Sequence, residues 1–250
     1  MKIILISASK GGVGKSTISA MLSLISQSLG VKVGLLDADF YGPSQRTILK
    51  ENTPLVKDRA GKFNLATCSG VQFVSLAHFN YTDKSTLIRG PMVSKLLDAV
   101  LDNSSWDDLD LLFVDMPPGT GDVPLSISKK MKVTGSVVVT TPQIVALEDV
   151  AKNIDMLERL NVPVMGVLEN MSHYIAPNGE KHYIFGQSNV NKLIKRFDIS
   201  YYGKLEILDW LSEECDKGLE MNTLHAAKDQ LDVLYRIANN IISNYVTQNT

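Results

Sequence analysis

The sequence predicts a three-layer, doubly wound α/β fold in which helices cover both faces of a mostly parallel sheet. Six short runs are almost continuously apolar, as expected of strands that are buried on both faces. Stretches with a helical period separate several of these runs. A glycine-rich turn joins the first apolar run to the first helical stretch. Such alternation of strands and helices indicates right-handed βαβ units in one open sheet.

The expected strands begin at the N-terminus. In chain order they are Lys2 to Ser7, Val31 to Leu36, Val71 to Leu76, Leu111 to Val114, Ser136 to Thr140 and Val164 to Leu168. The first run resembles the core of a signal peptide, but it has no small-residue cleavage site. It leads directly into Lys10-Gly11-Gly12, so we expect a buried strand.

Helical periodicity is clearest in three places. After the glycine turn, Ile18, Met21, Leu22, Ile25 and Leu29 fall on one face and Gly30 follows as a stop signal. The same spacing recurs between Leu147 and Leu157 and between Leu231 and Ile241. The stretch from Tyr41 to Gly70 is the least periodic and is expected to hold long surface loops. Without an internal repeat or a flexible linker, residues 1–250 are predicted to be a single domain.

Composition narrows the classes of function. A chain of 250 residues that is 44% hydrophobic can bury a large core, and its net charge of −2 does not favour nucleic acid or an anionic membrane as a partner. No apolar run is as long as a bilayer is thick. The two cysteines, Cys68 and Cys215, are far apart and lack metal-ligand spacing, which indicates a reducing compartment. We therefore expect a cytoplasmic protein.

The glycine-rich turn has the composition of a phosphate-binding loop. It reads Ser9-Lys10-Gly11-Gly12-Val13-Gly14-Lys15-Ser16-Thr17, between the first strand and the first helix. Glycines let consecutive backbone N–H groups converge on phosphate oxygens, and the helix that begins here points its positive end at them. Lys15 is expected to reach the β- and γ-phosphates and the Ser16 hydroxyl to join a Mg²⁺ shell. The turn departs from the strict G-x-x-x-x-G-K-[ST] pattern at Ser9, where glycine is usual. Lys10 is an unusual second lysine.

Carboxylates end two other expected strands. Asp37 and Asp39 follow the second, and Asp115 follows the fourth. In open parallel sheets this edge faces the ligand crevice, so Asp39 and Asp115 join Ser16 as candidate Mg²⁺ ligands. Each Asp alone could equally be a strand-end turn or a helix cap. Asn170 follows the strand that ends at Leu168, and its carboxamide could pair with an adenine edge or cap a turn.

These residues resemble a known family. The turn matches the deviant Walker A loop of the MinD/ParA ATPases, and further segments match the Mrp (also ApbC) family of iron–sulfur cluster carriers within that group. The segments are Tyr41-Gly42-Pro43-Ser44, Arg89-Gly90-Pro91-Met92, Asp115-Met116-Pro117-Pro118-Gly119-Thr120-Gly121-Asp122, Thr141-Pro142-Gln143 with Ala146-Leu147, Glu169-Asn170-Met171-Ser172 and Ile184-Phe185-Gly186. The resemblance spans nearly the whole chain and implies a P-loop NTPase fold.

The resemblance also implies a role for each residue. Lys10 would reach across a dimer interface to the partner's ATP, as an arginine finger does. Asp39 would orient the attacking water, Asp115 would hold Mg²⁺ and Asn170 would read adenine. The segment containing Pro117, Gly119, Gly121 and Asp122 would be switch II. Together these roles imply slow, switch-like ATP hydrolysis by a nucleotide-sandwiched dimer.

One departure from the family concerns the cluster itself. Mrp-type carriers place Cys-x-x-Cys shortly after the Asn-Met-Ser segment, so that a pair from each subunit holds a four-iron cluster. Here Ala176 stands in the first position, and the second is deleted between Asn178 and Gly179. Alanine offers no thiolate. His173 and His182 flank the gap and are either substitute ligands or ordinary surface histidines.

Three functions remain open. The first is an ATPase in iron–sulfur cluster assembly that acts through unusual ligands or as the ATPase partner of a cysteine-bearing subunit. It would form a homodimer, or a heterodimer with a related ATPase, and would serve iron–sulfur apoproteins. The second is a derived ATPase that has lost cluster binding and moves another cargo or regulates a partner. The third is a MinD/ParA-like positioning protein, which is disfavoured because the stretch from Gln230 to Val246 carries only Arg236 as a cation.

Overall fold

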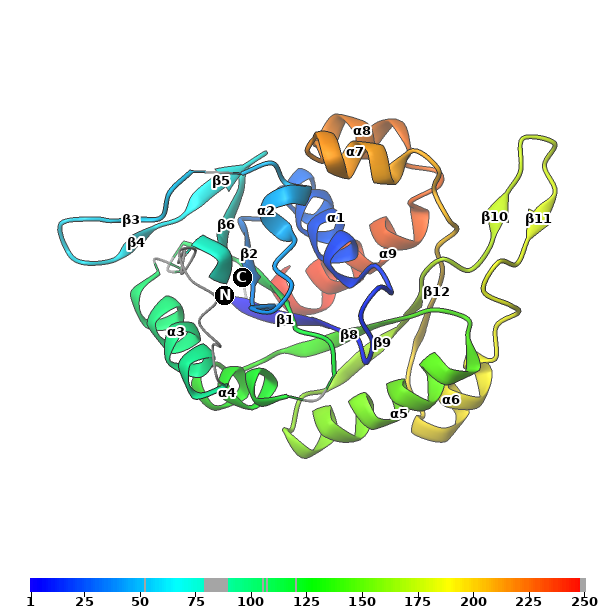
Figure 1. Cartoon of the computed structure of the whole chain (residues 1–250), viewed down its shortest axis with the longest axis horizontal. Coiled ribbons are helices and arrows are strands. Elements are labelled where there is room, and N and C mark those ends of the chain that lie inside the picture. Colours follow the sequence, from blue (N-terminus) through cyan, green and yellow to red (C-terminus); the bar gives the residue numbers. More distant parts are fainter. Residues whose placement is uncertain (52, 79–89, 105, 107, 120, 248–250) are drawn as a thin grey trace.

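An eight-stranded sheet forms the centre of the computed structural model (Figure 1). The structure describes residues 1–247 apart from 52, 79–89, 105, 107 and 120, with the backbone alone at 77, 90–92, 144 and 145. The strand order is β12-β9-β8-β1-β7-β2-β6-β5. The pairs are parallel except that β5 runs antiparallel to β6. The doubly wound, mostly parallel sheet predicted from the sequence is therefore confirmed.

Six strands coincide with the predicted apolar runs to within two residues at each end. They are β1 (Lys2–Ser7), β2 (Val33–Asp37), β6 (Val71–Ser75), β7 (Leu111–Asp115), β8 (Gly135–Thr140) and β9 (Val164–Glu169). The sheet gains β5 (Ala66–Cys68) and β12 (Tyr201–Lys204) at its edges. Two hairpins lie outside it, β3 (Val56–Lys57) with β4 (Phe63–Asn64) and β10 (Tyr174–Ile175) with β11 (Lys181–His182).

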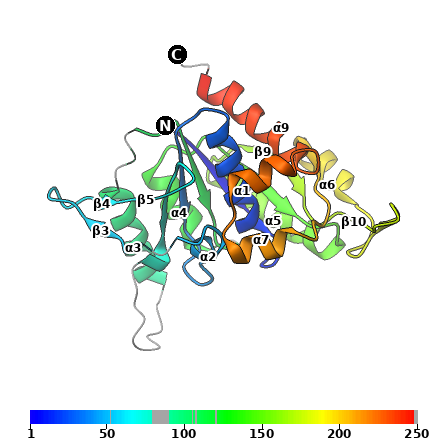
Figure 2. The ribbon, with the colours of Figure 1, turned by 90° about the horizontal axis from the view of Figure 1, so that it is seen from above.

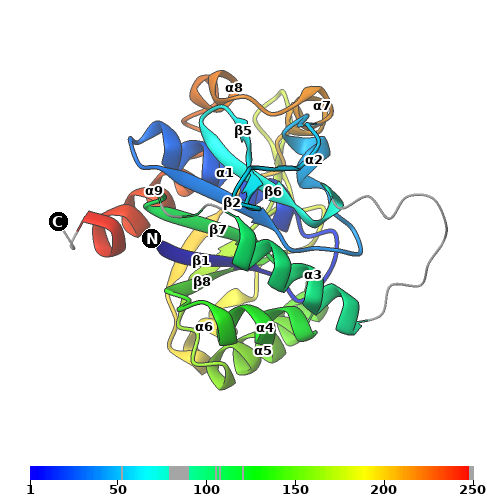
Figure 3. The same ribbon diagram turned by 90° about the vertical axis from the view of Figure 1, so that its left-hand side faces the viewer.

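Helices cover both faces of the sheet, as Figure 3 shows. One face carries α1 (Lys15–Ser28), α2 (Gln45–Ile48), α7 (Leu211–Lys217), α8 (Met221–Ala226) and α9 (Asp232–Ile241), which continues as a π-helical turn, η2 (Ile242–Val246). The other face carries α3 (Gly90–Asn103), α4 (Asp122–Lys130), α5 (Ile144–Arg159) and α6 (Val190–Phe197). A 3-10 turn, η1 (Leu76–His78), follows β6.

The period of two along the strands divides the core into two layers. In β1, Ile4 and Ile6 pack in the cluster that holds α1 and α9, whereas Ile3 and Leu5 pack in the cluster that holds α3, α4 and α5. Alternate side chains of a strand point to opposite faces, so a run that is apolar throughout is needed to fill both layers. This is why the strands carry no polar alternation.

The largest difference from expectation concerns Tyr41 to Gly70. Instead of long surface loops alone, this stretch contains α2, the β3–β4 hairpin and the edge strand β5. These elements are two to four residues long, so they are too short to show a hydrophobic period in the sequence.

The strand order brings three loops together. The chain runs from β1 outward to β2 and β6, returns with β7 between β1 and β2, and then builds the other half with β8, β9 and β12. The loops that leave β1, β2 and β7 therefore emerge side by side at the carboxyl edge, where ligands bind in such sheets. Separately, none of the described helices is both long enough and apolar enough to cross a membrane.

Candidate functional site

The loop between β1 and α1 has the shape of a phosphate cradle. Gly12 and Gly14 have φ angles of 81° and 83°, in the left-handed region that favours glycine, and Gly14 caps α1. A Cβ added at Gly11 or Gly12 would meet no heavy atom within 4 Å, so the backbone there faces open space. A phosphate group fits against this backbone at the N-terminus of a fourteen-residue helix.

A cavity of about 730 Å³ lies in front of this loop. Its lining contains most of the predicted site residues, namely Lys10, Gly11, Gly12, Gly14, Lys15, Ser16, Thr17, Asp39, Pro117, Gly121 and Asp122. Three segments that are far apart in the sequence therefore meet at one cavity. Val13 is buried beneath the loop, with 6% of its surface exposed, and anchors it to the core.

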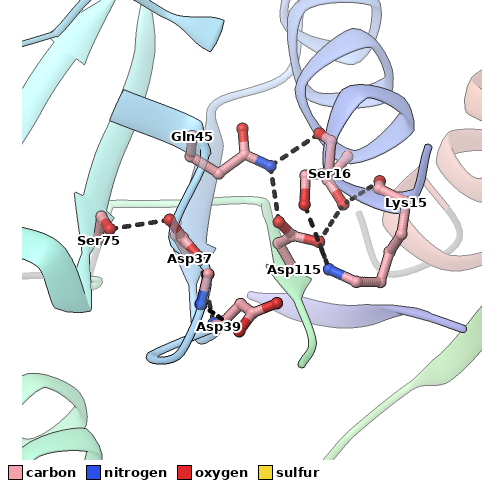
Figure 4. Close-up of polar contacts among 9 residues, drawn as sticks. Lys15, Ser16, Asp37, Asp39, Gln45, Ser75 and Asp115 are labelled. Atoms are coloured by element: carbon pink, nitrogen blue, oxygen red, sulfur yellow. Dashed lines mark hydrogen bonds and ion pairs between the residues drawn. The ribbon is translucent and has the colours of Figure 1, made fainter. Parts of the chain in front are cut away.

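Behind the cavity, Lys15 and Asp115 form a buried ion pair (Figure 4). The exposed fractions of their side chains are 6% and 0%. The Oδ1 atom of Asp115 accepts hydrogen bonds from Lys15 Nζ and, at 3.1 Å, from the Ser19 hydroxyl. Its Oδ2 atom accepts a bond of 2.9 Å from Gln45 Nε2. Lys15 Nζ also donates to Ser16 Oγ at 3.3 Å. The residue predicted to bind phosphate and the residue predicted to bind Mg²⁺ are therefore in contact.

Asp37 lies between Asp115 and Ser75 in the register of the sheet. The Ser75 hydroxyl donates to its Oδ2 atom at 2.8 Å, and the Asp39 N–H donates to its Oδ1 atom at 3.1 Å. Burial, and then the negative charge of Asp115, raise the pKa of Asp37 from 3.8 to about 7. The site therefore contains a carboxyl group that exchanges its proton near neutral pH.

Asp39 stands at the mouth of the site. It is 8% exposed and lines the cavity, and its Oδ1 atom accepts a hydrogen bond of 3.1 Å from the Gly42 N–H. This bond folds the loop after β2 back over the cavity and fixes one oxygen of the carboxylate. A carboxylate in this place can bind a water molecule or a metal-bound water.

Lys10 lies on the rim, with 38% of its side chain exposed. Its Nζ atom is 3.3 Å from Asp149 Oδ2 on α5, and the same carboxylate pairs with Lys152 at 3.0 Å. The lysine thus contacts α5 of its own subunit and also borders the cavity.

Asn170 lies on the other side of the loop. Its Nδ2 atom donates to the carbonyl oxygen of Val13 at 2.8 Å. It lines a second cavity of about 290 Å³ together with Gly14, Thr17, Leu208 and Cys215. Gly14 and Thr17 border both cavities, so one cavity suits a triphosphate and its neighbour suits a base.

The loop after β7 connects back to the phosphate loop. The Gly119 N–H donates to the Ala8 carbonyl oxygen at 3.1 Å, and Gly119 has a φ of 88°. Gly121 caps α4, so Asp122 is the first residue of a helix rather than part of a loop. Thr120 and Arg89, from two of the matched segments, lie outside the described residues.

The segment that departs from the carrier pattern is an exposed hairpin, β10–β11, which stands away from the sheet in Figure 1 and Figure 2. Its turn is closed by bonds from the Ala176 N–H to Glu180 O and from the Gly179 N–H to Ala176 O. His173 Nδ1 is bonded to the Ser172 hydroxyl, whereas His182 is half exposed. The described part of the chain has no group of three His, Cys, Asp or Glu side chains that could hold a metal ion.

The two cysteines do not supply the missing ligands. Cys68 lies on β5 and Cys215 on α7, and burial raises the pKa of each thiol. Neither cysteine lies on the β10–β11 hairpin, where the family's motif falls. The residues of this chain therefore do not fit a cluster held in the family's manner.

Sequence reasoning missed four residues of the site. Ser19 lies one helical turn after Lys15, so helical spacing could have found it. Ser75 ends an apolar strand, which is the signal that identified Asp115. Gln45 and Asp149 have no signal in the sequence, because each reaches the site from an element far away along the chain.

Comparisons with known proteins agree on one family for this chain. Residues 1–242 match the family model described as ParA, NUBPL iron-transfer P-loop NTPase. The iron-sulfur cluster carrier protein of Pseudomonas fragi is 40% identical over 220 residues, which is 86% of this chain and 76% of the relative. The protein of the same name from Escherichia coli K12 is 40% identical over 236 residues, which is 94% of this chain and 64% of the relative.

A third relative of that name, from Aquifex aeolicus, is 40% identical over 86% of this chain, and this chain spans 60% of its length. Among solved structures, a nucleotide-binding protein in complex with ADP from Archaeoglobus fulgidus has a TM-score of 0.76 and 31% identity, over 89% of this chain and 88% of that one. The septum site-determining protein MinD from Pyrococcus horikoshii shares the fold, with a TM-score of 0.69, 16% identity and coverage of 96% and 95%.

Proposed function

We propose a function from the premise that this chain belongs to the NUBPL iron-transfer P-loop NTPase family of the ParA group. It binds Mg-ATP at the loop from Lys10 to Thr17 and hydrolyses it slowly, as a switch for iron–sulfur cluster transfer. Residues 1–250 act as one ATPase domain. The observation that carries the proposal is the pair of adjoining cavities that share Gly14 and Thr17.

The residues present fit a magnesium triphosphate. The backbone of Gly11 and Gly12 leaves room for phosphate, and Lys15 supplies the cation. With Lys15 turned to phosphate, Asp115 Oδ1 and the Ser16 hydroxyl would hold the metal, directly or through water. When bound, Mg²⁺ would neutralise charge that develops on the phosphates. Asp39 orients the attacking water from the loop after β2, and Asn170 binds the base.

Lys10 acts on a second subunit. In this chain it is paired with Asp149 and also lines the cavity. In a dimer that pairs two cavities, the lysine leaves Asp149 and contacts the partner's nucleotide, as a finger supplied in trans does. ATP-dependent dimerisation and hydrolysis then depend on the same side chain.

The cluster is cargo of the reaction, and its ligands come from outside this chain. The β10–β11 hairpin has no thiol, so we propose that a related subunit with a Cys-x-x-Cys motif pairs with this one, and that the pair serves apoproteins. The same hairpin favours a second candidate, an ATPase of this family that moves a different cargo. In either case the nucleotide chemistry is the same.

The nucleotide proposal is tested with Lys15→Ala and Lys10→Ala. Lys15→Ala should lose binding of a fluorescent ATP analogue, because the triphosphate loses its main buried cation. Lys10→Ala should bind the analogue as the wild type does, yet lose ATP-dependent dimerisation, measured by light scattering, and turnover by roughly 10³-fold or more. Lys152→Ala is the matched control, since it removes the other partner of Asp149 without touching the cavity. Normal turnover of Lys10→Ala would exclude the trans role.

Reconstitution with iron and sulfide separates the two candidates for cargo. The chain alone should show no absorbance of a bound cluster, and the absorbance should appear when a cysteine-bearing relative is added with ATP. A cluster on the chain alone that disappears in the His173→Ala, His182→Ala double variant would instead establish unusual ligands. Absence of a cluster in both mixtures would favour a different cargo.

A further inference from the structure

We infer that Gln45 is a positioning residue for the metal site, which orients Asp115 and joins the Asp39 loop to it. Gln45 lies on α2 and is completely buried. Its Nε2 atom donates to two acceptors, Asp115 Oδ2 at 2.9 Å and the Ser16 carbonyl oxygen at 2.8 Å. One amide group therefore bridges two of the expected metal-binding segments (Figure 4).

The orientation of this amide is fixed by its partners. A carboxylate and a carbonyl oxygen only accept hydrogen bonds, so the NH₂ side of the amide must face them. Lys15 and Ser19 hold the Oδ1 atom of Asp115, and Gln45 holds Oδ2. Gln45 thus completes the hydrogen bonds that set the angle of the carboxylate. A metal ligand whose supporting bonds are lost keeps its charge but not its direction.

The hydrogen bonds of the amide, rather than its packing, account for a polar side chain at this buried position. Among the described residues, the Oε1 atom of Gln45 has no hydrogen-bond partner, although it is buried. An unpaired buried carbonyl is unfavourable, and a methionine of similar shape would avoid it only by leaving the buried Asp115 Oδ2 atom without its donor. The amide is therefore explained by the acceptors that it binds.

Gln45 also transmits the state of the loop after β2. The loop from Asp39 to Ser44 leads directly into α2, and the Gly42 N–H holds Asp39 Oδ1 at 3.1 Å. A movement of this loop that shifts α2 must either break the bonds of Gln45 or carry Asp115 with it. The groups expected to hold the metal and to orient the water are thereby kept in register.

The test is Gln45→Met, with Gln27→Met as the matched control near the C-terminal end of α1. This inference rests on the proposed function. Gln45→Met should remain folded but unfold at a lower temperature, because the buried Asp115 Oδ2 atom loses its donor, and it should bind a fluorescent ATP analogue normally in EDTA. The Mg²⁺ concentration that gives half of the magnesium-dependent gain in affinity should rise about 10–100-fold, and turnover should fall over the same range. Gln27→Met should change neither quantity.

A second measurement separates positioning from a general loss of structure. Placed in an Asp115→Asn background, Gln45→Met should alter magnesium dependence by less than about twofold, because the group it orients is already lost. Equal magnesium dependence of Gln45→Met and wild type would overturn the inference. If the wild type itself gains no affinity from Mg²⁺, the proposed function fails instead.

Discussion

At the scale of residues, the site concentrates negative charge beside a single buried lysine. Asp37 and Asp115 are both completely buried and lie opposite each other on neighbouring strands, while Lys15 is bonded to Asp115. Burial, and then repulsion by the Asp115 carboxylate at this spacing, raise the pKa of Asp37. The negative charge of this site would be neutralised further by a bound Mg²⁺ ion.

This balance predicts a pH dependence of stability. The pKa of Asp37 is raised in the folded protein to about 7 from 3.8, so its favourable contribution is complete below pH 3.8 and is lost as the pH rises through 7. Asp37→Asn cannot ionise, so it should gain about 2–3 kcal/mol relative to wild type between pH 5 and pH 8. Urea unfolding of both proteins in EDTA measures this difference. A difference that is constant with pH would contradict the assignment.

Some of these site residues could be predicted from the sequence and others could not. The phosphate loop was recognisable because its glycines and lysines are contiguous between Ser9 and Thr17. Asp39 and Asp115 followed from their places at the ends of apolar strands, and the structure puts Asp39 at the cavity and Asp115 directly behind it. Gln45 and Asp149 could not be found, since their roles depend on tertiary contacts. The catalytic roles of these residues stay predictions.

At the scale of elements, the phosphate loop depends on two glycines with left-handed backbone. Gly14→Ala places a Cβ 2.3 Å from Asn170 Nδ2, at a φ of 83°. The variant should lose about 1–3 kcal/mol of stability from backbone strain and from displacement of Asn170, and it should also lose ATP affinity. Chemical unfolding measures the first effect. Gly11→Ala, which meets no atom within 4 Å, should leave stability unchanged, and equal losses in both variants would refute this explanation.

Strands and helices could be predicted where they are long enough to show an apolar run or a helical period. The six buried strands were found because they are continuous apolar runs, and the helices α1, α5 and α9 because their apolar residues recur with a helical spacing. The edge strand β12 was missed because its residues Tyr201–Lys204 are only partly buried or exposed and show no apolar run. The last predicted helix, ending at Val246, is α9 followed by a π-helical turn, which the sequence does not distinguish from an α-helix.

At the scale of the whole molecule, the nucleotide would contact several loops of the sheet edge at once. The two cavities are lined by loops after β1, β2, β7 and β9 and by α7. A ligand at a concentration of 100 times its Kd should add about 2.7 kcal/mol to stability. For a chain of this size Tm should rise by roughly 5–10 °C with Mg-ATP in calorimetry. Lys15→Ala should show no such rise, and a rise in this variant would place the nucleotide elsewhere.

The β10–β11 hairpin can tolerate changes of sequence without disturbing the rest of the fold. From Pro177 to Ile184 all side chains are exposed, and the turn is held by its own backbone bonds rather than by either core layer. Residues at its tip can be replaced, inserted or deleted with little penalty to the folded state. Changes of sequence on this arm therefore leave both core layers and the phosphate loop undisturbed.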